Sequence, residues 1–324
     1  GKVVIVYSDY DNSKYGTAVV GTLSGTSVSF GTGVVFNSEI TQGMTIVYDS
    51  SNEKVVLAYI DEGYSPAYSL IVKVGTVSGT SISFGSGTAV DTASTVSGTF
   101  DSSNNKVILA FESAGDCSAS GYSGCAVVGT VSGTSISFGT IVEFDDGGGV
   151  QHGAATFDSN SNKVVIAYDD QDDSNTGRAI VGTVSGTSIS FGSPTTFNSG
   201  STNDIATTFD TTNNKIVIAY RDTGNSNYGT AIVGTVSGTS ISFGSEVVFH
   251  SARADSMRQI VFIPDLGTLI GFRDSGDGKA IYGTVSGTSI SFDTATTFGD
   301  ADGYYGIIIA YDSENGEAIV IYED

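Results

Sequence analysis

The sequence predicts an all-β fold, a single six-bladed β-propeller over residues 1–324, and three observations support this. Val, Ile, Phe, Tyr and Thr dominate the apolar runs, which is the composition of strands. The chain has 43 Gly, 3 Pro and no Trp, as expected of short strands joined by tight turns. A repeat of about 49–54 residues is typical of a four-stranded propeller blade. Its signature, Ser-Gly-Thr-Ser-(Ile/Val)-Ser-Phe, starts at Ser24, Ser78, Ser132, Ser185, Ser237 and Ser286.

Each repeat reads as four antiparallel strands, here called a, b, c and d. In the fifth repeat we expect them at residues 206–210, 215–220, 231–236 and 240–243. Strand a is rich in small residues and so belongs innermost, where blades converge. Strand b is continuously apolar, which predicts cover on both faces. A turn of the form Asp-(Ser/Thr)-x-Asn-x-Lys joins strands a and b, because such side chains bond to nearby backbone amides.

The two ends of the chain predict how the propeller closes. Strands a, c and d occur six times, but strand b occurs seven times, first at residues 2–7 and last at residues 317–322. We expect the N- and C-terminal strands to pair, with residues 306–312 innermost in the blade that holds residues 17–36. One b strand is then in excess and is a template for association with another copy of the chain. The expected assembly residues are Lys2, Val4, Val6, Ile319 and Ile321.

The two cysteines, Cys117 and Cys125, lie in one short loop. Zinc requires about four ligands, and the neighbouring residues do not supply the others. We therefore expect a disulfide, which indicates an oxidising, extracellular or cell-surface location. Two reduced thiols are the alternative.

The charge and hydropathy of the chain exclude two classes of partner. A net charge of −22, with only 13 Lys and Arg, argues against binding to nucleic acid. No apolar stretch approaches the roughly 20 residues of a membrane-spanning helix, so membrane insertion is not expected.

Acidic residues recur where strand b ends, and two of the following b–c loops are rich in oxygen ligands. Calcium binds 6–8 oxygens from flexible loops, so a calcium site is one prediction and no other cofactor is expected. The alternative is that these carboxylates cap backbone amides in turns. The candidate ligands are Asp9, Asp11, Asp169, Asp170, Asp172 and Asp173, and the wider series includes Asp61, Asp222, Asp274 and Asp324.

Catalysis finds little support in the sequence. His152 and His250 lie in different repeats, and no second basic group recurs beside them. Sialidases are six-bladed propellers with three substrate-binding arginines and Trp-containing turns. This chain has five arginines, of which Arg221 and Arg273 stand at the same position in two of its own repeats, and it has no Trp. That resemblance is one of architecture, and a shared fold does not carry function.

The repeated phrase resembles tandem β-propeller repeats of microbial surface and secreted proteins. The resemblance covers nearly the whole chain and implies an extracellular scaffold or adhesive role. We therefore expect a non-enzymatic structural or adhesive module that assembles end to end, as a filament or a tandem array. The alternative is a lectin-like module that binds glycans with its b–c loops.

Overall fold

The protein is seen here as a computed structural model, and its described part confirms the all-β prediction. Apart from one 3-10 turn, η1 (Tyr10–Asn12), the regular structure of this part consists of antiparallel β-sheets. The chain divides into two compact units, residues 1–151 with 184–190, and residues 152–183 with 191–324. Each unit is described by itself. The structure describes residues 1–115, 117, 122–146, 149–151, 153–257, 259–300 and 306–322.

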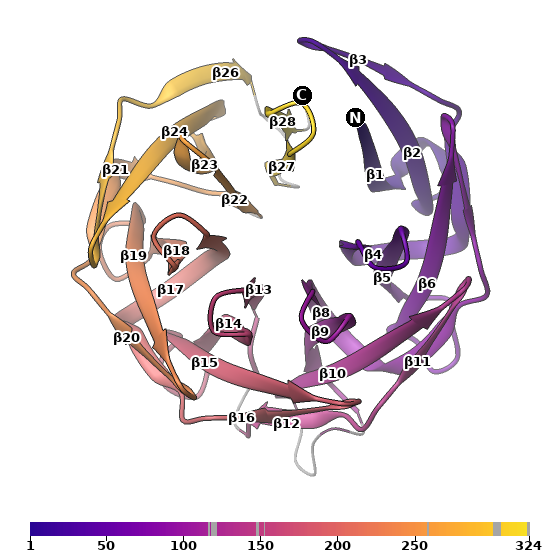
Figure 1. Cartoon of the computed structure of the whole chain (residues 1–324), viewed down its shortest axis with the longest axis horizontal. Helices are drawn as coiled ribbons and strands as arrows, with labels where there is room; N and C mark the ends of the chain where they lie inside the picture. The colour runs from indigo at the N-terminus through magenta and orange to yellow at the C-terminus, as the bar shows by residue number, and fades with distance from the viewer. Residues whose placement is uncertain are drawn as a thin grey trace. The chain divides into compact units, whose positions relative to one another are not determined.

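The first unit contains a twelve-stranded sheet made by three repeats (Figure 1). Its order is β1-β2-β4-β5-β6-β8-β9-β10-β11, while β3 pairs with β2, β7 with β6 and β12 with β10. The strands are β1 (Lys2–Asp9), β2 (Tyr15–Ser24), β3 (Ser27–Phe30), β4 (Val34–Asp49), β5 (Lys54–Asp61), β6 (Ser69–Ser78), β7 (Ser81–Phe84), β8 (Thr88–Asp101), β9 (Lys106–Ser113), β10 (Ser123–Ser132), β11 (Ser135–Phe138) and β12 (Val142–Asp145).

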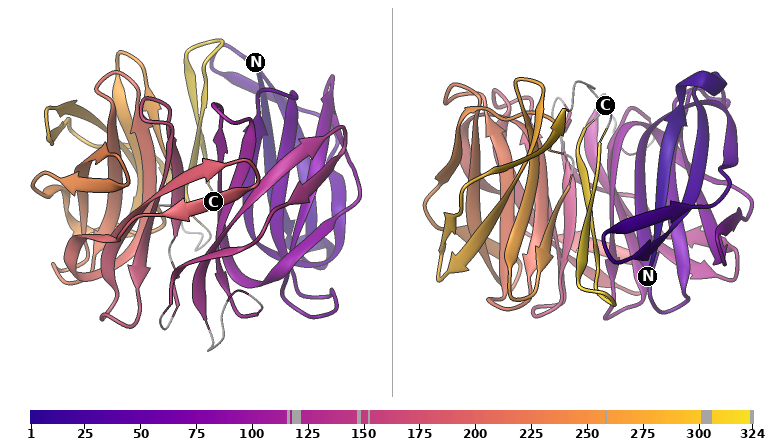
Figure 2. Two further views of the ribbon diagram at one scale, coloured as in Figure 1. Left: turned by 60° about the horizontal axis from the view of Figure 1, so that its bottom comes forward. Right: turned by 90° about the horizontal axis from the view of Figure 1, so that it is seen from above.

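The remaining strands form sheets of nine, five and two strands. The nine-stranded sheet holds β13 (Ala154–Asp158), β14 (Lys163–Asp170), β15 (Thr176–Ser185), β16 (Ser188–Phe191), β17 (Thr195–Asp210), β18 (Lys215–Asp222), β19 (Tyr228–Ser237), β20 (Ser240–Phe243) and β21 (Val247–Arg253). The five-stranded sheet holds β22 (Ile260–Ile263), β23 (Gly267–Asp274), β24 (Asp277–Ser286), β25 (Ser289–Phe292) and β26 (Thr296–Asp300). A hairpin of β27 (Ile308–Asp312) and β28 (Glu317–Ile321) completes the set (Figure 2).

The a, b, c and d strands of each repeat form what we call a repeat sheet. In the second repeat sheet they are the second half of β4, then β5, β6 and β7. Strands b and c and the short strand d lie where the sequence predicts them; the fifth repeat has them at β18, β19 and β20. The expected cover of strand b is also present, because every residue of β5, β9 and β14 after the first is buried.

The connection from strand d to the next strand a differs from the expected loop. Three long strands, β4, β8 and β17, pair first with strand c of one repeat and then with strand b of the next. The register shifts inside each strand, at residues where the chain leaves one sheet for the other. In two of them a left-handed residue marks the shift, Gly43 with φ 53° and Asp204 with φ 48°. Such bulges bend a strand and increase its twist.

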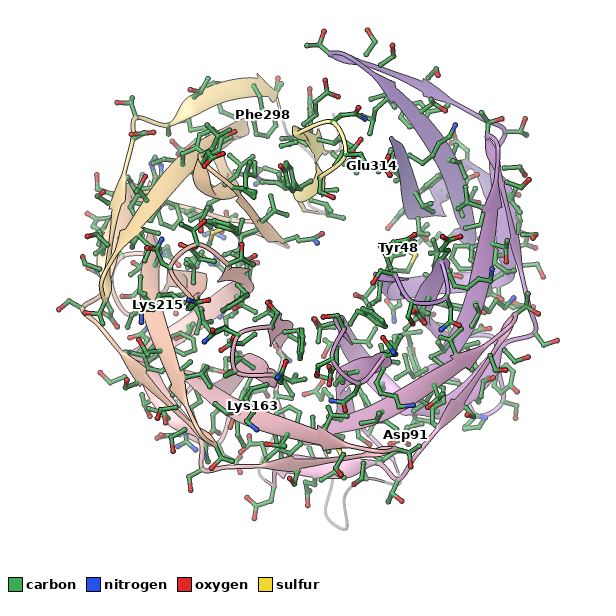
Figure 3. All side chains as sticks on the ribbon, in the orientation of Figure 1. Tyr48, Asp91, Lys163, Lys215, Phe298 and Glu314 are labelled. Atoms are coloured by element: carbon green, nitrogen blue, oxygen red, sulfur yellow. A yellow bond between two sulfur atoms is a disulfide. The ribbon has the colours of Figure 1, made fainter. Side chains whose placement is uncertain are left out.

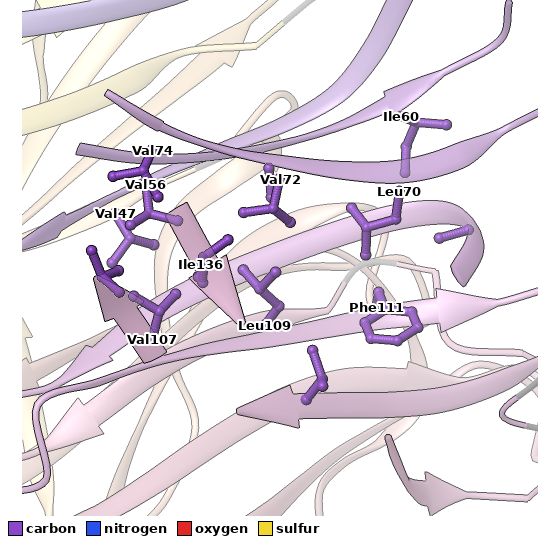
Figure 4. Packing of buried hydrophobic residues seen from close by; sticks show 14 of the residues in the cluster. Val47, Val56, Ile60, Leu70, Val72, Val74, Val107, Leu109, Phe111 and Ile136 are labelled. Carbon is purple, nitrogen blue, oxygen red and sulfur yellow. The ribbon is translucent and has the colours of Figure 1, made fainter. Parts of the chain in front are cut away.

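The hydrophobic cores lie between successive repeat sheets. In the first unit, Val56 and Val72 of the second repeat sheet pack in one cluster with Leu109 and Phe111 of β9 (Figure 4). Ile136 of β11 belongs to the same cluster and is 6% exposed. Side chains on both faces of a repeat sheet thus require a neighbouring sheet, which explains why strand b is apolar throughout.

The expected closing pair is not among the strand pairings of the described residues. β1 pairs only with β2 in the first unit, and β27 pairs only with β28 in the second. Closure into a propeller therefore stays a prediction.

Candidate assembly site

β1 is the b strand of the first repeat, and strand a is missing beside it in the described residues. Its pairing with β2 leaves the opposite edge without a strand. β5, the equivalent strand of the next repeat, is buried over seven of its eight residues. In β1 only Val3 is buried, and Tyr7 is 38% exposed, whereas its equivalent Tyr59 is 1% exposed. β1 is therefore an open, largely apolar edge.

The backbone groups that face this open edge follow from the pairing with β2. Leu23 N–H donates a hydrogen bond to Gly1 O at 3.2 Å. Successive residues of an antiparallel strand alternate between facing the partner and facing away. The odd-numbered residues of β1 therefore bond to β2. The N–H and C=O groups of Lys2, Val4 and Val6, three of the expected assembly residues, face the open edge.

β28 is also a b strand. It packs against the sixth repeat sheet in the way that the b strand of each following repeat packs against the repeat sheet before it. The ring centroids of Phe298 in the sixth repeat and Tyr322 lie 5.0 Å apart. The same contact joins Phe36 to Tyr59 at 5.1 Å in the first unit. β28 pairs with β27 on one side, and its other edge has no strand among the described residues. The hairpin thus has strands a and b but lacks c and d.

The second repeat sheet shows which residues of a b strand face strand c. Gly85 N–H donates to Val74 O at 2.9 Å, so Val74 faces strand d. The adjacent residue Lys73 then faces strand b, where it is opposite Leu57. Leu57 and every second residue on either side of it therefore form their backbone hydrogen bonds with strand c. The residues between them form theirs with strand a.

Applied to β28, this rule corrects one prediction. Val320 stands at the position of Leu57, so Ala318 and Val320 face the open edge. Ile319 and Ile321, which we expected at the assembly edge, direct their backbone groups to β27. The sequence alone could not show this, because the alternation is fixed only once the hairpin register is known.

A glycine after each of the first five phrases makes a close backbone contact with the next repeat. A Cβ added to Gly244 would lie 1.8 Å from Thr288 O, and one added to Gly31 would lie 1.9 Å from Thr80 O. The same contact is made by Gly85, Gly139 and Gly192. The sixth position is Asp293, which keeps the backbone bond of the series, with its N–H donating to Tyr282 O at 3.0 Å, but is exposed.

The first repeat also lacks the cover that the others have. All four residues of β3 are exposed, and Phe30 is 56% exposed. Its neighbour in the phrase, Val28, is exposed as well, whereas the equivalent Ile82 is buried. The first repeat thus has two exposed parts, the open edge of β1 and the strand β3, which lies on the other side of β2.

The acidic residues considered for calcium are engaged in other ways. Asp170 Oδ1 accepts the N–H groups of Asp172 and Asp173, at 3.1 and 3.2 Å. Arg178 lies 2.7 Å from Asp170 and 2.8 Å from Asp173. Asp169 is buried. Asp170 thus caps backbone amides, as the alternative prediction expects. It also pairs with Arg178, a partner that the sequence did not indicate.

No group of three or more His, Cys, Asp or Glu that could hold a metal ion occurs in the part of the chain that the structure describes. Asp9 and Asp11 flank the start of η1 without a side-chain cap. Asp324, the last of the series, lies outside the described residues. Calcium binding therefore stays a prediction of the sequence.

Charged side chains at the ends of strand b form ion pairs in the second unit. Arg221 Nη1 lies 2.8 Å from Asp255 of the sixth repeat. His250 Nε2 lies 3.1 Å from Asp274, which also accepts a hydrogen bond from Lys279. The bond from Lys279 lowers the pKa of Asp274 below its ordinary value, against a smaller effect of burial. These pairs join neighbouring strands, and His152 lies outside the described residues.

The predicted disulfide between Cys117 and Cys125 is present. It ties the loop after β9 to the start of β10, where Cys125 is fully buried. A disulfide fits an oxidising compartment. Among the described residues, no helix has the length and apolar character needed to cross a membrane.

Comparisons with known proteins support the fold only. No family model matches the chain, and no curated protein matches it. A solved protein of unknown function from Dyadobacter fermentans is similar at 11% identity with a TM-score of 0.52, covering 74% of this chain and 78% of that one. A triple arginine-to-alanine mutant of AofleA from Arthrobotrys oligospora has 11% identity and a TM-score of 0.57, covering 99% and 92%.

Proposed function

We propose that this protein is a non-enzymatic structural module and the repeating bead of a filament. In this proposal the repeat sheets are the blades of a six-bladed propeller. One observation carries it: within the part of the chain that the structure describes, the b strands β1 and β28 each have one edge without a strand, and the two edges are of different kinds. β1 lacks strand a, whereas β28 lacks strand c.

Two different edges favour head-to-tail contact between copies. A contact between unlike surfaces does not close on itself in a pair, and its repetition gives a filament. The b strands of one propeller all run in the same direction. Within one copy, β28 and β1 would therefore be parallel to each other. An antiparallel pair of β28 and β1, like the other strand pairs of this protein, needs the two strands to come from different copies. Pairing them extends a sheet across the two copies without displacing any strand.

The glycine contacts support a weaker junction between the sixth and the first repeat sheets of the proposed propeller. Closing the ring with a sixth contact of the same kind would bring Asp293 against Thr26, the equivalent of Thr80. A side chain does not fit where a Cβ would be about 2 Å from a carbonyl oxygen, and such overlap is destabilising. The proposed propeller would therefore have five tight contacts and one loose junction, beside the open edges.

Backbone bonds alone would give weak association. A few hydrogen bonds of about 1 kcal/mol each compare with an association cost of about 4–15 kcal/mol. Burial of apolar surface must supply the rest, at about 25 cal/mol per Å². The exposed side chain of Tyr7 lies on β1 itself, and Val28 and Phe30 of β3, on the other side of β2, add exposed apolar surface to the same repeat sheet; together they would supply it.

An extracellular location agrees with the disulfide and the acidic composition. The disulfide needs an oxidising compartment. A net charge of −22 keeps individual beads soluble. The regularity of the repeats supports a structural role, because the strands and turns change little from one repeat to another.

Proline substitution at the two edges tests the proposal. Val4→Pro and Val320→Pro each remove an N–H that faces an open edge, where proline is tolerated. We expect either variant to abolish filaments in electron micrographs and to sediment as a monomer. Val4→Ile, which keeps the N–H, should assemble like the wild type.

Thermal unfolding of each variant provides the folding control, and we expect a melting temperature within a few degrees of the wild type. Filaments of normal length from Val4→Pro would refute the proposal. So would a wild-type protein that stays monomeric at every concentration.

A further inference from the structure

Exposed tyrosines gather on the b–c loops of the first unit. Tyr10 follows β1, Tyr64 and Tyr68 lie between β5 and β6, and Tyr122 precedes β10. Each of these four residues, which we call the tyrosine face, is about half exposed. The equivalent loops of the second unit, at residues 171–175, 223–227 and 275–276, contain no aromatic residue.

Backbone hydrogen bonds join the loops of the tyrosine face into one continuous edge. The loop with Tyr10 is tied to β4, because Thr41 N–H donates to Lys14 O at 3.1 Å. The adjacent residue of β4, Ile40, accepts the N–H of Glu62 at 3.1 Å, which ties β4 to the second loop.

The same arrangement continues through β8. Ala93 N–H donates to Tyr68 O at 2.9 Å, and Ala114 N–H donates to Thr92 O at 3.0 Å. Tyr122 lies three residues before Cys125, whose disulfide to Cys117 ties the start of β10 to a residue that follows β9. The four tyrosines therefore lie beside strand ends that follow one another along the same end of the strands.

Tyr68 adopts a backbone conformation that does not suit tyrosine. Its φ is 63°, in the left-handed region. The second unit has Asn175 and Asn227 at the equivalent positions, with φ of 59° and 63°. Asparagine tolerates this region well, whereas a bulky residue there is strained. Lys14 of the first repeat has φ 61° at the equivalent position, so the conformation belongs to a turn that the repeats share. What distinguishes this loop is a tyrosine ring, 51% exposed, at a position where the second unit has asparagine.

We propose that the tyrosine face binds a neutral, extended polysaccharide. The flat face of a tyrosine ring packs against the apolar C–H side of a sugar ring, and its hydroxyl stays in water or bonds to the sugar. Rings on three successive loops suit a chain of repeating units better than a single small ligand, since contacts along one chain reinforce each other.

Charge distinguishes this partner from others. The protein carries −22, and acidic residues such as Asp11 and Glu62 lie in the same loops, so anionic polymers are repelled. Carboxylates and backbone carbonyls accept hydrogen bonds from sugar hydroxyls. The rings stand on separate loops rather than in one apolar groove, which disfavours an apolar peptide. Lys14, a cation in the first of these loops, lies 5.0 Å from the centroid of the Tyr10 ring and is engaged there.

Affinity electrophoresis tests the proposal with a panel of soluble neutral glucans, mannans and xylans. We expect at least one polymer to retard the wild type and Val4→Pro alike. Tyr68→Asn copies the equivalent loops, so it should weaken binding at least fivefold while keeping or raising the melting temperature. Tyr122→Ala should weaken binding similarly. Tyr48→Ala is the matched control: Tyr48 of β4, labelled in Figure 3, is 60% exposed and pairs with Val55 at the start of β5, away from the loop that follows β5, so binding should not change.

Three results would overturn the proposal. One is the absence of retardation by every neutral polymer. Another is unchanged binding by Tyr68→Asn and Tyr122→Ala. The third is binding to cationic polylysine alone that disappears at high salt, which would mark the face as a site for basic peptides. None of these results depends on whether the beads assemble, because Val4→Pro provides the unassembled protein.

Discussion

At the scale of the residue, an aspartate that ends strand a organises the turn into strand b in the second to fifth repeats. Asp49 Oδ1 accepts the N–H groups of Ser51 and Asn52 at 3.0 Å, and its Oδ2 accepts the Asn52 side-chain amide at 2.9 Å. Asp101 makes the same set of bonds. Burial raises the pKa of Asp49, but these hydrogen bonds outweigh burial and hold the pKa below its ordinary 3.8.

This lowered pKa predicts how the turn depends on pH. A carboxyl whose pKa is lower in the folded state stabilises the fold above its unfolded pKa, and the contribution is lost as pH falls through the folded pKa. We therefore expect Asn52→Ala to cost about 1.5 kcal/mol at pH 7 and less than half of that near pH 2. Urea unfolding at both pH values measures it, with Ser50→Ala as the control. An equal cost at both pH values would contradict the role of the charged carboxylate.

The glycine after the phrase predicts a second residue-scale effect. A Cβ on Gly244 would overlap Thr288 O, and a backbone atom cannot turn aside as a side chain does. We expect Gly244→Ala to lower the free energy of unfolding by about 3 kcal/mol. Gly153→Ala, where no atom lies within 4 Å of the added Cβ, should change it by less than about 1 kcal/mol. Similar values for the two variants, in the same denaturant titration, would be inconsistent with a close-contact role for Gly244.

These two features differ in how far the sequence could predict them. The aspartate turn was predictable because its donors are two and three residues away from the carboxylate. The role of Gly244 was not, because the atom it meets belongs to Thr288 in the next repeat. A repeated glycine in the sequence indicates a constraint but does not name the neighbour that imposes it.

At the scale of the element, strands b, c and d were predictable because each is a short apolar run bounded by turn residues. The long strands β4, β8 and β17 were not, because their middle residues are polar and leave one sheet for another at a bulge. The b–c loops were recognised as acidic. The arginine that pairs with Asp170, by contrast, stands eight residues further along the chain, in β15.

This ion pair predicts the result of a calcium test. Arg178 neutralises part of the loop after β14, so we expect neither 5 mM calcium nor a chelator to change the melting temperature by more than about 1 °C. Arg178→Ala should lower stability by about 1–3 kcal/mol, because it leaves the buried Asp170 with fewer partners. A clear rise of the melting temperature with calcium would restore Asp169, Asp170, Asp172 and Asp173 as ligands.

At the scale of the whole molecule, the account rests on two unlike edges at the two ends of the chain. The sequence predicted one b strand too many but left open which of the two is in excess. The contact of Phe298 with Tyr322 places β28 in the position that follows the sixth repeat sheet. This placement of β28 rests on a contact between two residues that are 24 positions apart in the chain, which the repeat pattern alone does not predict.

Mixing the two proline variants tests the central claim most directly. Val4→Pro keeps the β28 edge, and Val320→Pro keeps the β1 edge. Each variant alone should therefore sediment as a monomer, while an equimolar mixture should give a one-to-one heterodimer and nothing longer in analytical ultracentrifugation. Filaments or homodimers from either variant alone, or monomers only in the mixture at concentrations where the wild type assembles, would contradict head-to-tail pairing of β28 with β1.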